Sequence, residues 1–520
     1  MTETSNSLSK ICKPTLDELA SSPTFSMSRG AKELFHTNFI AFVLELPPAQ
    51  RTAELQAART RLLARLFGPN PPDEVWVWRE HSNLDLVILA APGVDKPDGA
   101  VMKLMDGTLL TAYKTKGDRL ASQAGRAPLV IIEAKFKSLP TAEQLRGYDK
   151  KLRKGIDLEL DEIRVDSETY PGDLRLTKFH VQLSGDPTTH SKDAPYALLR
   201  AYGTKGDDAG QRTFAAAHCN IKRILLAPSH GETAVPDTDW DLLPWSELVA
   251  ALKIQEAVLP GPGDRGLVLA KRLTPCLVQE YCQSTERLLA LRDRVVDRMN
   301  RFFSPDGECL SALCDDLSLG FHAYRLHDLV GKLGFSLLSQ RLFDEANREL
   351  KQQIAHLRTN GWTLVHQAFM TRAKPGLNIE FISTTDEEAD LDSPKTQVLR
   401  VGVQVQECVY RHFVSVLKPL KHPEPLAAVV ELLGRREDEM PSEWWQVRAL
   451  DKPADEQGEA SLEPARAGKF DDKAFLYTHR DAHDLSYERL RAAILDSLMQ
   501  AIGLLQPETK FREQAIALLN

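Results

Sequence analysis

The chain has 520 residues, 42% of them hydrophobic and 27% charged, which is the composition of a globular protein with two or three domains. Its net charge of −8 excludes a protein that coats nucleic acid indiscriminately, and its longest apolar runs are far too short to cross a membrane. Seven scattered cysteines do not form a disulfide framework, and Cys309 and Cys314 lack the second pair that a zinc site needs. Residues 1–10 lack the apolar stretch of a secretory signal, so we expect a cytoplasmic protein.

The first 70 residues predict a loose arm followed by two helices. Residues 1–28 are rich in Ser and Thr, and we expect them to form a flexible N-terminal arm. Residues 31–45 then form an amphipathic pattern, with apolar side chains at three- and four-residue spacing. These side chains are Leu34, Phe35, Phe39, Phe42 and Val43. Pro47 ends this helix, and a second helix is predicted over 53–67.

Strands are predicted in the next part of the chain. Two apolar segments, 75–78 and 84–89, flank the polar turn 79–83, which favours a β-hairpin. Another strand is predicted within 101–113. The same patterns predict strands over 129–132, 178–183, 196–201 and 221–227, and helices after Thr141 and over 246–254.

The pattern changes twice beyond the Pro- and Gly-rich segment 260–263, which we interpret as a hinge. Residues 267–357 have helical periodicity throughout. Apolar and polar residues then alternate over 401–406, as in a half-buried antiparallel strand. A final helix is predicted over 486–505.

These elements group into four parts. We expect an N-terminal arm, then an α/β domain with a mixed sheet, then a helical region, and finally an α+β accessory domain. Their predicted boundaries are 1–28, 29–258, 264–360 and 361–520.

The segment from Pro128 to Lys135 carries the most unusual chemistry. An apolar strand runs directly into Glu133 and Lys135, and burying either charge without a partner is costly. Asp85 lies within another apolar strand. If the two strands pair, both carboxylates and the Ala134 carbonyl converge on one divalent cation such as Mg²⁺. Such a cation activates water for phosphodiester hydrolysis, and Lys135 would hold that water.

Each residue of this group also has a simpler interpretation. Glu133 and Lys135 equally fit a structural ion pair, and Asp85 fits a strand-end carboxylate paired with Arg79. Gln144 and Tyr148 fit an exposed helix face. The nuclease hypothesis therefore depends on the order of the elements along the chain and not on any one residue.

That order resembles the PD-(D/E)XK nuclease superfamily. The helix Glu33-Leu-Phe-His-Thr-Asn-Phe-Ile is similar to the Glu…His-Ser/Thr-Asn-Phe-Leu helix of one bacterial branch. Asn83-Leu84-Asp85 is similar to the motif that carries the metal-binding aspartate in that branch. Leu84 stands where the family usually has proline.

Two further motifs complete the resemblance, which covers about residues 30–250. Glu133-Ala134-Lys135 resembles the signature triplet, and Gln144-Leu-Arg-Gly-Tyr148 resembles the Gln-Leu-x-x-Tyr helix that follows it. The 48 residues from Asp85 to Glu133 are more than the family pattern leads us to expect, as is the length of 155–215.

The resemblance implies a fold and a metal site. The fold would be a restriction-endonuclease-like mixed sheet flanked by helices, followed by a helical segment and an α+β C-terminal domain. Asp85 and Glu133 would bind Mg²⁺, for which Mn²⁺ can substitute. The Ala134 carbonyl would be a third ligand, and Glu33 is an additional candidate.

The resemblance also implies catalytic roles. Lys135 would be the catalytic lysine, Glu33 the helical acid that supports the site, and Gln144 the residue that orients a group near it. The implied activity is Mg²⁺-dependent phosphodiester hydrolysis by a DNA endonuclease, in a bacterial defence setting suggested by analogy alone.

A basic stretch surrounds the triplet. Residues 114–154 hold eleven Lys or Arg against four Asp or Glu, a local net charge of +7. We expect basic residues after the triplet to contact a nucleic-acid backbone, although a solvated helix face explains 150–154 equally well. The predicted contacts are Lys137, Arg146, Lys150, Lys151, Arg153 and Lys154.

Three functional hypotheses remain. The first is the DNA endonuclease, the second is a catalytically inactive module on the same fold that binds nucleic acid or protein, and the third is an RNA-directed toxin. We expect nucleic acid as the partner, DNA in preference to RNA, and no membrane. A homodimer is left open.

Overall fold

The computed structural model describes most of the chain in two compact units. The described residues are 7–28, 32–81, 84–91, 129–136, 142–167, 170–184, 196–205, 208–228, 239–255, 257–318, 321, 324–371, 374–383, 399–416, 474–506, 513, 514 and 517. One unit is Asp17–Ala290, and the other combines Met1–Leu16 with Leu291–Asn520. The division falls inside the long helix α9 (Gly266–Phe302), and not at 260–263. Within these ranges no helix is both long enough and apolar enough to span a lipid bilayer.

The N-terminal segment is helical, in contrast to the loose arm that we expected. It forms α1 (Leu8–Ser21) and α2 (Pro23–Ser28), and Leu19 and Phe25 are buried. The Glu280 carboxylate of α9 accepts a hydrogen bond from the Thr24 amide at 3.1 Å and another from the Ser22 hydroxyl. Apolar burial and these bonds outweigh the polar composition of the segment.

The two predicted helices and the hairpin are confirmed. The elements are α3 (Lys32–Glu45), α4 (Ala53–Phe67), β1 (Glu74–His81) and β2 (Leu84–Ala91). The Thr52 hydroxyl caps α4 by accepting a hydrogen bond from the Leu55 amide at 3.3 Å. β1 and β2 pair antiparallel, with Trp78 opposite Val87. The strand predicted within 101–113 lies outside the described residues.

The central sheet is mixed. β3 (Leu129–Ala134) pairs antiparallel with β2 and parallel with the end of β7 (Asp208–Ala227). The short β8 (Asp241–Pro244) pairs with β7 on the other side. The strand order is β1-β2-β3-β7, with β8 beside β7.

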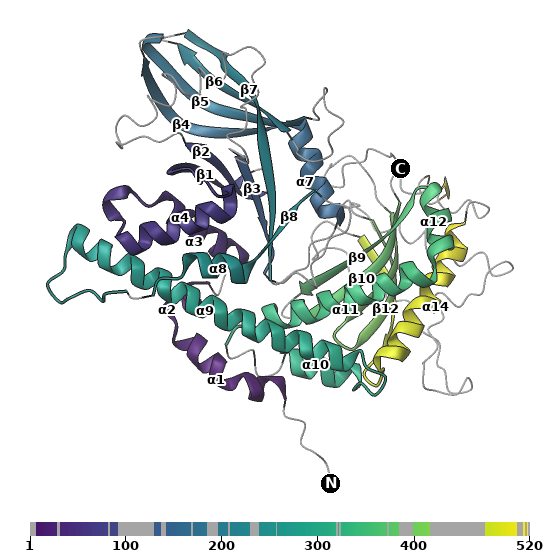
Figure 1. The fold of residues 1–520 in the computed structure, drawn as a ribbon. Helices are drawn as coiled ribbons and strands as arrows, with labels where there is room; N and C mark the ends of the chain where they lie inside the picture. The colour runs from purple at the N-terminus through teal and green to yellow at the C-terminus, as the bar shows by residue number, and fades with distance from the viewer. Residues whose placement is uncertain are drawn as a thin grey trace, which may run out of the picture. The chain divides into compact units, whose positions relative to one another are not determined.

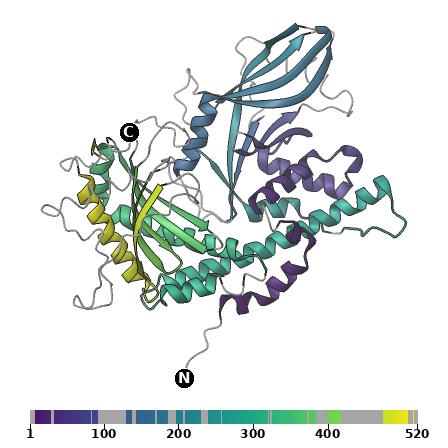
Figure 2. The same ribbon diagram turned by 180° about the vertical axis from the view of Figure 1, so that it is seen from behind.

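Three antiparallel strands extend the sheet from the first part of β7. Its strands are β4 (Ile156–Ser167), β5 (Tyr170–Ser184) and β6 (Tyr196–Lys205). Figure 1 and Figure 2 show these strands standing away from β1–β3, with β7 running from one group into the other. The predicted strand pieces at 178–183 and 196–201 are therefore parts of longer strands.

Helices cover both faces of the central sheet, as predicted (Figure 1). α7 (Ala142–Lys154) buries Leu145 and Leu152 in the same core as Val87 of β2 and Ile131 of β3. α3 contacts β1 and β2, and α8 (Trp245–Leu252) contacts β8. Each fully buried aliphatic side chain of this kind contributes about 1.5–3 kcal/mol of transfer free energy.

The second unit is an antiparallel sheet with helices, in agreement with the predicted α+β arrangement. Its strands follow the order β13-β12-β11-β10-β9. The strands are β9 (Trp362–Thr371), β10 (Lys374–Ser383), β11 (Leu399–Gln406), β12 (Val409–Val416) and β13 (Ala474–Asp481). The helices after α9 are α10 (Leu310–Ser318), α11 (His327–Glu349), α12 (Lys351–Thr359) and α14 (Tyr487–Leu505).

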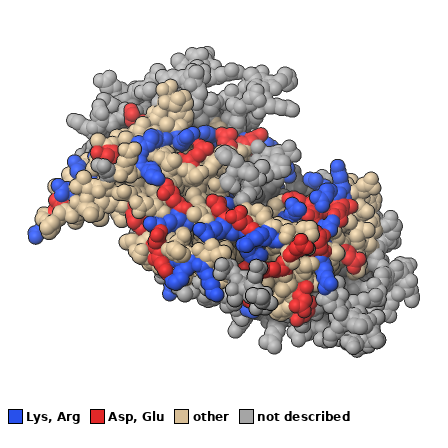
Figure 3. All heavy atoms as spheres, turned by 60° about the horizontal axis from the view of Figure 1, so that its bottom comes forward, with Lys and Arg blue, Asp and Glu red and all other residues tan. Residues whose placement is uncertain are grey.

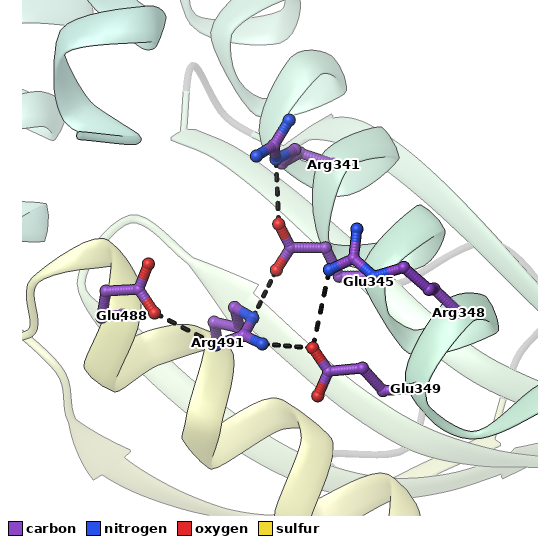
Figure 4. Close-up of polar contacts among 6 residues, drawn as sticks. All are labelled: Arg341, Glu345, Arg348, Glu349, Glu488 and Arg491. Atoms are coloured by element: carbon purple, nitrogen blue, oxygen red, sulfur yellow. Dashed lines mark hydrogen bonds and ion pairs between the residues drawn. The ribbon is translucent and has the colours of Figure 1, made fainter. Parts of the chain in front are cut away.

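An ion-pair network joins α11 to α14 (Figure 4). Arg491 of α14 pairs with Glu345 at 2.5 Å and with Glu349, both on α11. Arg341 binds the other oxygen of Glu345 at 2.9 Å. Because Glu345 is only 4% exposed, this carboxylate depends on its two arginines for compensation of its burial.

Candidate metal centre

Asp85 and Glu133 lie next to each other on adjacent strands. The antiparallel register pairs Leu86 with Ile132, and one further step along each strand brings Asp85 opposite Glu133. The backbone amide of Ala134 donates a hydrogen bond of 2.6 Å to Oδ2 of Asp85. The strand pairing assumed in the sequence analysis is therefore present, and it joins the aspartate to the triplet.

Both carboxylates belong to the face of the sheet that α7 covers. Side chains alternate along a strand, so Asp85 shares a face with Val87, and Glu133 shares a face with Ile131. Val87 and Ile131 pack in one core with Leu145 of α7. The site thus lies at the edge of a buried apolar core, where solvent screening of charge is weak.

The alternative partner proposed for Asp85 is wrong. Arg79 pairs with Glu45 at the end of α3, and its position in the β-ladder is opposite Leu86. Asp85 instead receives its hydrogen bond from the main chain of the triplet.

The two carboxylate oxygens of Glu133 differ in their hydrogen-bond partners. Oε1 pairs with Nζ of Lys135 at 2.5 Å and accepts a hydrogen bond of 2.9 Å from the Tyr148 hydroxyl. The amide of Gln144 donates to that hydroxyl at 3.0 Å. Oε2 is buried and has no hydrogen-bond partner among the described residues. A buried carboxylate oxygen without a donor is costly, so this oxygen is a candidate ligand for a cation.

Gln144 therefore reaches Glu133 through Tyr148 and not directly. Tyr148 belongs to the Gln-Leu-x-x-Tyr motif, but no role in the site was predicted for it. The spacing of four residues on a helix, which brings two side chains together on one face, was the available signal.

Glu33 contacts the main chain just after the triplet. It lies in the first turn of α3, and its Oε1 accepts a hydrogen bond of 3.1 Å from the Phe136 amide. Its negative charge also raises the pKa values of Asp85, Glu133 and Lys135. Glu33 is therefore near the site and contributes charge to it.

The site has an excess of buried negative charge. Burial and then the Glu133 carboxylate raise the pKa of Asp85 to about 7. Burial raises the pKa of Glu133 by more than the Lys135 ammonium lowers it. Burial lowers the pKa of Lys135, but the attraction of Glu133 outweighs it and the pKa is raised overall. One lysine does not neutralise these acids, and an added cation would stabilise their charged forms.

The donor set fits a hard divalent cation better than a zinc cage. Among the residues that the structure describes, no three His, Cys, Asp or Glu side chains are arranged to enclose a metal ion. Mg²⁺ takes one or two carboxylates and keeps several waters, and Asp85 and Glu133 match that requirement. The Ala134 amide is bonded to Asp85, and the ligand role of its carbonyl stays a prediction.

A second buried charge cluster attaches α7 to the sheet. Arg223 of β7 is 2% exposed and pairs with Asp149 of α7 at 2.7 Å and with Asp239 at 3.1 Å. The Trp240 indole donates to Asp149 at 3.1 Å. Because α7 carries Tyr148, this cluster also fixes the position of the hydroxyl that binds Glu133. The charged pair Lys222-Arg223 inside the otherwise apolar strand 221–227 was the sequence signal for it.

The predicted nucleic-acid contacts follow one side of α7. Lys151 is half-buried, with Nζ 6.0 Å from the centre of the Tyr148 ring, and Lys137 lies outside the described residues. The remaining four are exposed and recur at helical spacing: Arg146, Lys150, Arg153 and Lys154.

Comparisons with known proteins do not assign the chain to a family. No protein-family profile, curated protein or solved structure matches the chain. The resemblance to PD-(D/E)XK nucleases therefore rests on the sequence motifs.

Proposed function

We propose that the chain is a Mg²⁺-dependent nuclease of the PD-(D/E)XK type, with DNA as its substrate. The observation that carries the proposal is the meeting of Asp85 with Glu133 and Lys135, joined by the hydrogen bond from Ala134 to Asp85. The order α3, β1, β2, β3, α7, β7 around these residues supports a restriction-endonuclease-like core. A role in bacterial defence is proposed by analogy alone.

The side chains of the site suit phosphodiester hydrolysis. Asp85 and Glu133 would hold Mg²⁺, which supplies neutralisation of phosphate charge and lowers the pKa of water when it is bound. Lys135 carries a proton and a positive charge that would stabilise charge developing on the phosphate. Tyr148 restricts the rotation of Glu133 through Oε1, which leaves Oε2 for a ligand.

The basic side of α7 supports nucleic acid as the substrate. Its exposed Lys and Arg offer several contacts to a phosphate backbone, and they lie on the helix that also carries Tyr148. On the face drawn in Figure 3, positive and negative side chains are interspersed, in keeping with the net charge of −8. Binding would therefore depend on a local basic surface and not on the charge of the whole molecule.

One observation favours the inactive binding module as a second candidate. Oε1 of Glu133 already has two partners, Lys135 and Tyr148, which also suits a purely structural ion pair. Such a module would bind nucleic acid through α7 and would not cleave it.

A cleavage panel tests the proposal. Plasmid DNA, single-stranded DNA and RNA are incubated with the protein in Mg²⁺, Mn²⁺ or EDTA. We expect metal-dependent cleavage of DNA that falls by about 10²–10³-fold in Asp85→Asn, Glu133→Gln and Lys135→Met. Lys253→Met, at an exposed ion pair with Glu286, is the matched control and keeps full activity.

Three results would change the conclusion. Binding without cleavage under any metal condition supports the inactive module. Cleavage of RNA alone supports the RNA-directed toxin. Cleavage that survives in folded Glu133→Gln and Lys135→Met variants would show that the activity arises elsewhere.

A further inference from the structure

Four rings pack together, and one of them belongs to the residue that follows Lys135 in the chain. They are His36 of α3, Phe136, Trp245 of α8 and Tyr281 of α9. The His36 ring is stacked on the Phe136 ring, with centroids 4.6 Å apart and planes 19° apart. Trp245 lies 5.1 Å from His36 and 5.4 Å from Phe136. All four therefore form one contact group, which we call the ring cluster.

The ring cluster has one polar contact at its far end. Nδ1 of His36 lies 3.0 Å from the Tyr281 hydroxyl, so one of the two groups donates a hydrogen bond to the other. His36 is 2% exposed, and burial lowers its pKa to about 4, so its ring is uncharged at neutral pH. Phe39 stacks on Tyr281 with centroids 3.9 Å apart, which fixes the phenol ring from the other side.

The ring cluster determines where the Lys135 main chain lies. β3 ends at Ala134, so Lys135 depends on individual hydrogen bonds for its position. Its amide donates to the Leu226 carbonyl at 2.7 Å, and its carbonyl accepts from the Trp245 indole at 2.8 Å. The next amide, that of Phe136, donates to Glu33 at 3.1 Å. Trp245 and Phe136 thus connect the ring cluster to the carbonyl side of Lys135, whereas Leu226 of β7 binds its amide.

We infer that His36 and Tyr281 are positioning residues for Lys135. Their hydrogen bond fixes the His36 ring, that ring fixes Phe136 and Trp245, and these two residues fix the Lys135 backbone. The catalytic part of this inference, that the two residues support cleavage, rests on the proposed nuclease function. The structural claim, that they hold the Lys135 backbone in place, does not depend on that function.

By this inference, α9 contributes a positioning residue to the α/β unit that holds Lys135. The predicted nuclease-like domain ends at residue 258, and Tyr281 lies 23 residues beyond that boundary. Glu280, next to Tyr281, also accepts the hydrogen bonds from α2, and Glu286 pairs with Lys253 at 3.0 Å. The first half of α9 is therefore bound to the α/β unit at several points.

The structural claim can be tested without metal or substrate. The full chain is treated with acetic anhydride in EDTA, and acylation of each lysine is followed by mass spectrometry. The variants are Tyr281→Phe, which keeps the ring and removes the hydroxyl, His36→Phe, which keeps an aromatic but larger ring and removes the hydrogen bond, and their double variant. Cys282→Ala is the matched control, because Cys282 is also buried on α9 but bonds to Val249. Lys253, whose side chain is 59% exposed, is the internal reference.

We expect each single variant to raise the acylation rate of Lys135 about tenfold, with Lys253 unchanged. The double variant should match the single variants, because both changes remove one hydrogen bond. Cys282→Ala should leave Lys135 as protected as in the unmodified protein. Unchanged Lys135 reactivity in the folded variants would overturn the inference, and so would an equal rise in Cys282→Ala.

Cleavage kinetics test the catalytic part separately. We expect His36→Phe and Tyr281→Phe to lower kcat about tenfold and to leave KM unchanged, because they displace Lys135 without touching the nucleic-acid surface. A variant that loses only stability should keep its kcat when the assay temperature is well below its Tm. If the unmodified protein cleaves and the variants keep its kcat, the positioning role is wrong. If the unmodified protein cleaves nothing, the nuclease proposal fails, and the acylation result still decides the structural claim.

Discussion

Asp85 and Ala134 are joined by a hydrogen bond of 2.6 Å, from the Ala134 amide to Oδ2 of the aspartate. Ala134 is the residue between Glu133 and Lys135, so this bond ties the carboxylate of one strand to the charged pair of the next. This hydrogen bond lowers the pKa of Asp85, but burial and the Glu133 carboxylate outweigh it and raise the pKa to about 7.

The raised pKa of Asp85 predicts a pH dependence of stability without metal. The folded protein holds this proton up to about pH 7, whereas the unfolded chain releases it near pH 3.9. The stabilisation is therefore fully present below about pH 4 and is lost as pH rises through about 7. In EDTA, Tm should fall between pH 5 and pH 8, and Asp85→Asn should reduce that fall. Equal slopes for both proteins in thermal unfolding would contradict the prediction.

Removal of the Tyr148 hydroxyl should weaken cleavage more than removal of Gln144. Tyr148→Phe deletes the 2.9 Å hydrogen bond to Glu133, whereas Gln144→Ala removes only the 3.0 Å hydrogen bond to the phenol from this pathway. We expect kcat to fall about tenfold in Tyr148→Phe and less in Gln144→Ala. The double variant should equal Tyr148→Phe, because the two residues act in series. An additive loss would mean that Gln144 has a separate contact with the substrate.

The basic side of α7 predicts a specific salt dependence of binding. Arg146 and Arg153 are exposed, and each phosphate contact with duplex DNA contributes about −0.9 to the slope of log K against log salt. Arg146→Ala and Arg153→Ala should each make the slope shallower by about that amount. The measurement is fluorescence anisotropy of a labelled duplex at several salt concentrations, with Lys253→Ala as control. Slopes equal to that of the control would place the binding surface elsewhere.

The network of Figure 4 predicts a difference between two carboxylates that share one arginine. Glu345 is 4% exposed, whereas the side chain of Glu488 is 53% exposed, and both pair with Arg491. Glu345→Ala should lower the unfolding free energy by about 1.5–3 kcal/mol, because it removes the buried carboxylate that joins Arg491 to Arg341. Glu488→Ala should cost less than about 1 kcal/mol. Urea unfolding of the full chain measures both, and similar losses would contradict this assignment of burial.

Local periodicity was sufficient for much of the first unit. The apolar spacing in 31–45 predicted α3, the paired runs around 79–83 predicted the β1–β2 hairpin, and the run before Glu133 predicted β3. In each case the side chains that face the core repeat with the period of the element, so the signal lies within one short segment.

The extension of β4–β7 was largely missed, because long antiparallel strands are stabilised by their neighbours. β7 has 20 residues and pairs with β6 in its first part and with β3 in its last. Cross-strand contacts supply this stability, and the Gly, Asp and Pro residues of 155–215 give no local signal of a strand. The helix α1 was missed for a related reason, since its burial outweighs its polar composition.

The sequence by itself determined which charged residues end or interrupt buried strands: Asp85, Glu133 and Lys135. Only the tertiary structure decided that Asp85 bonds to Ala134 and not to Arg79, since strand register determines which atoms meet. Likewise, only the packing of helices on the sheet brought Tyr148 to Glu133 and Tyr281 to His36. The sequence separation of these pairs, 15 residues and 245, explains the difference. A pattern read along the chain specifies what a segment buries, whereas its partners depend on how distant segments pack.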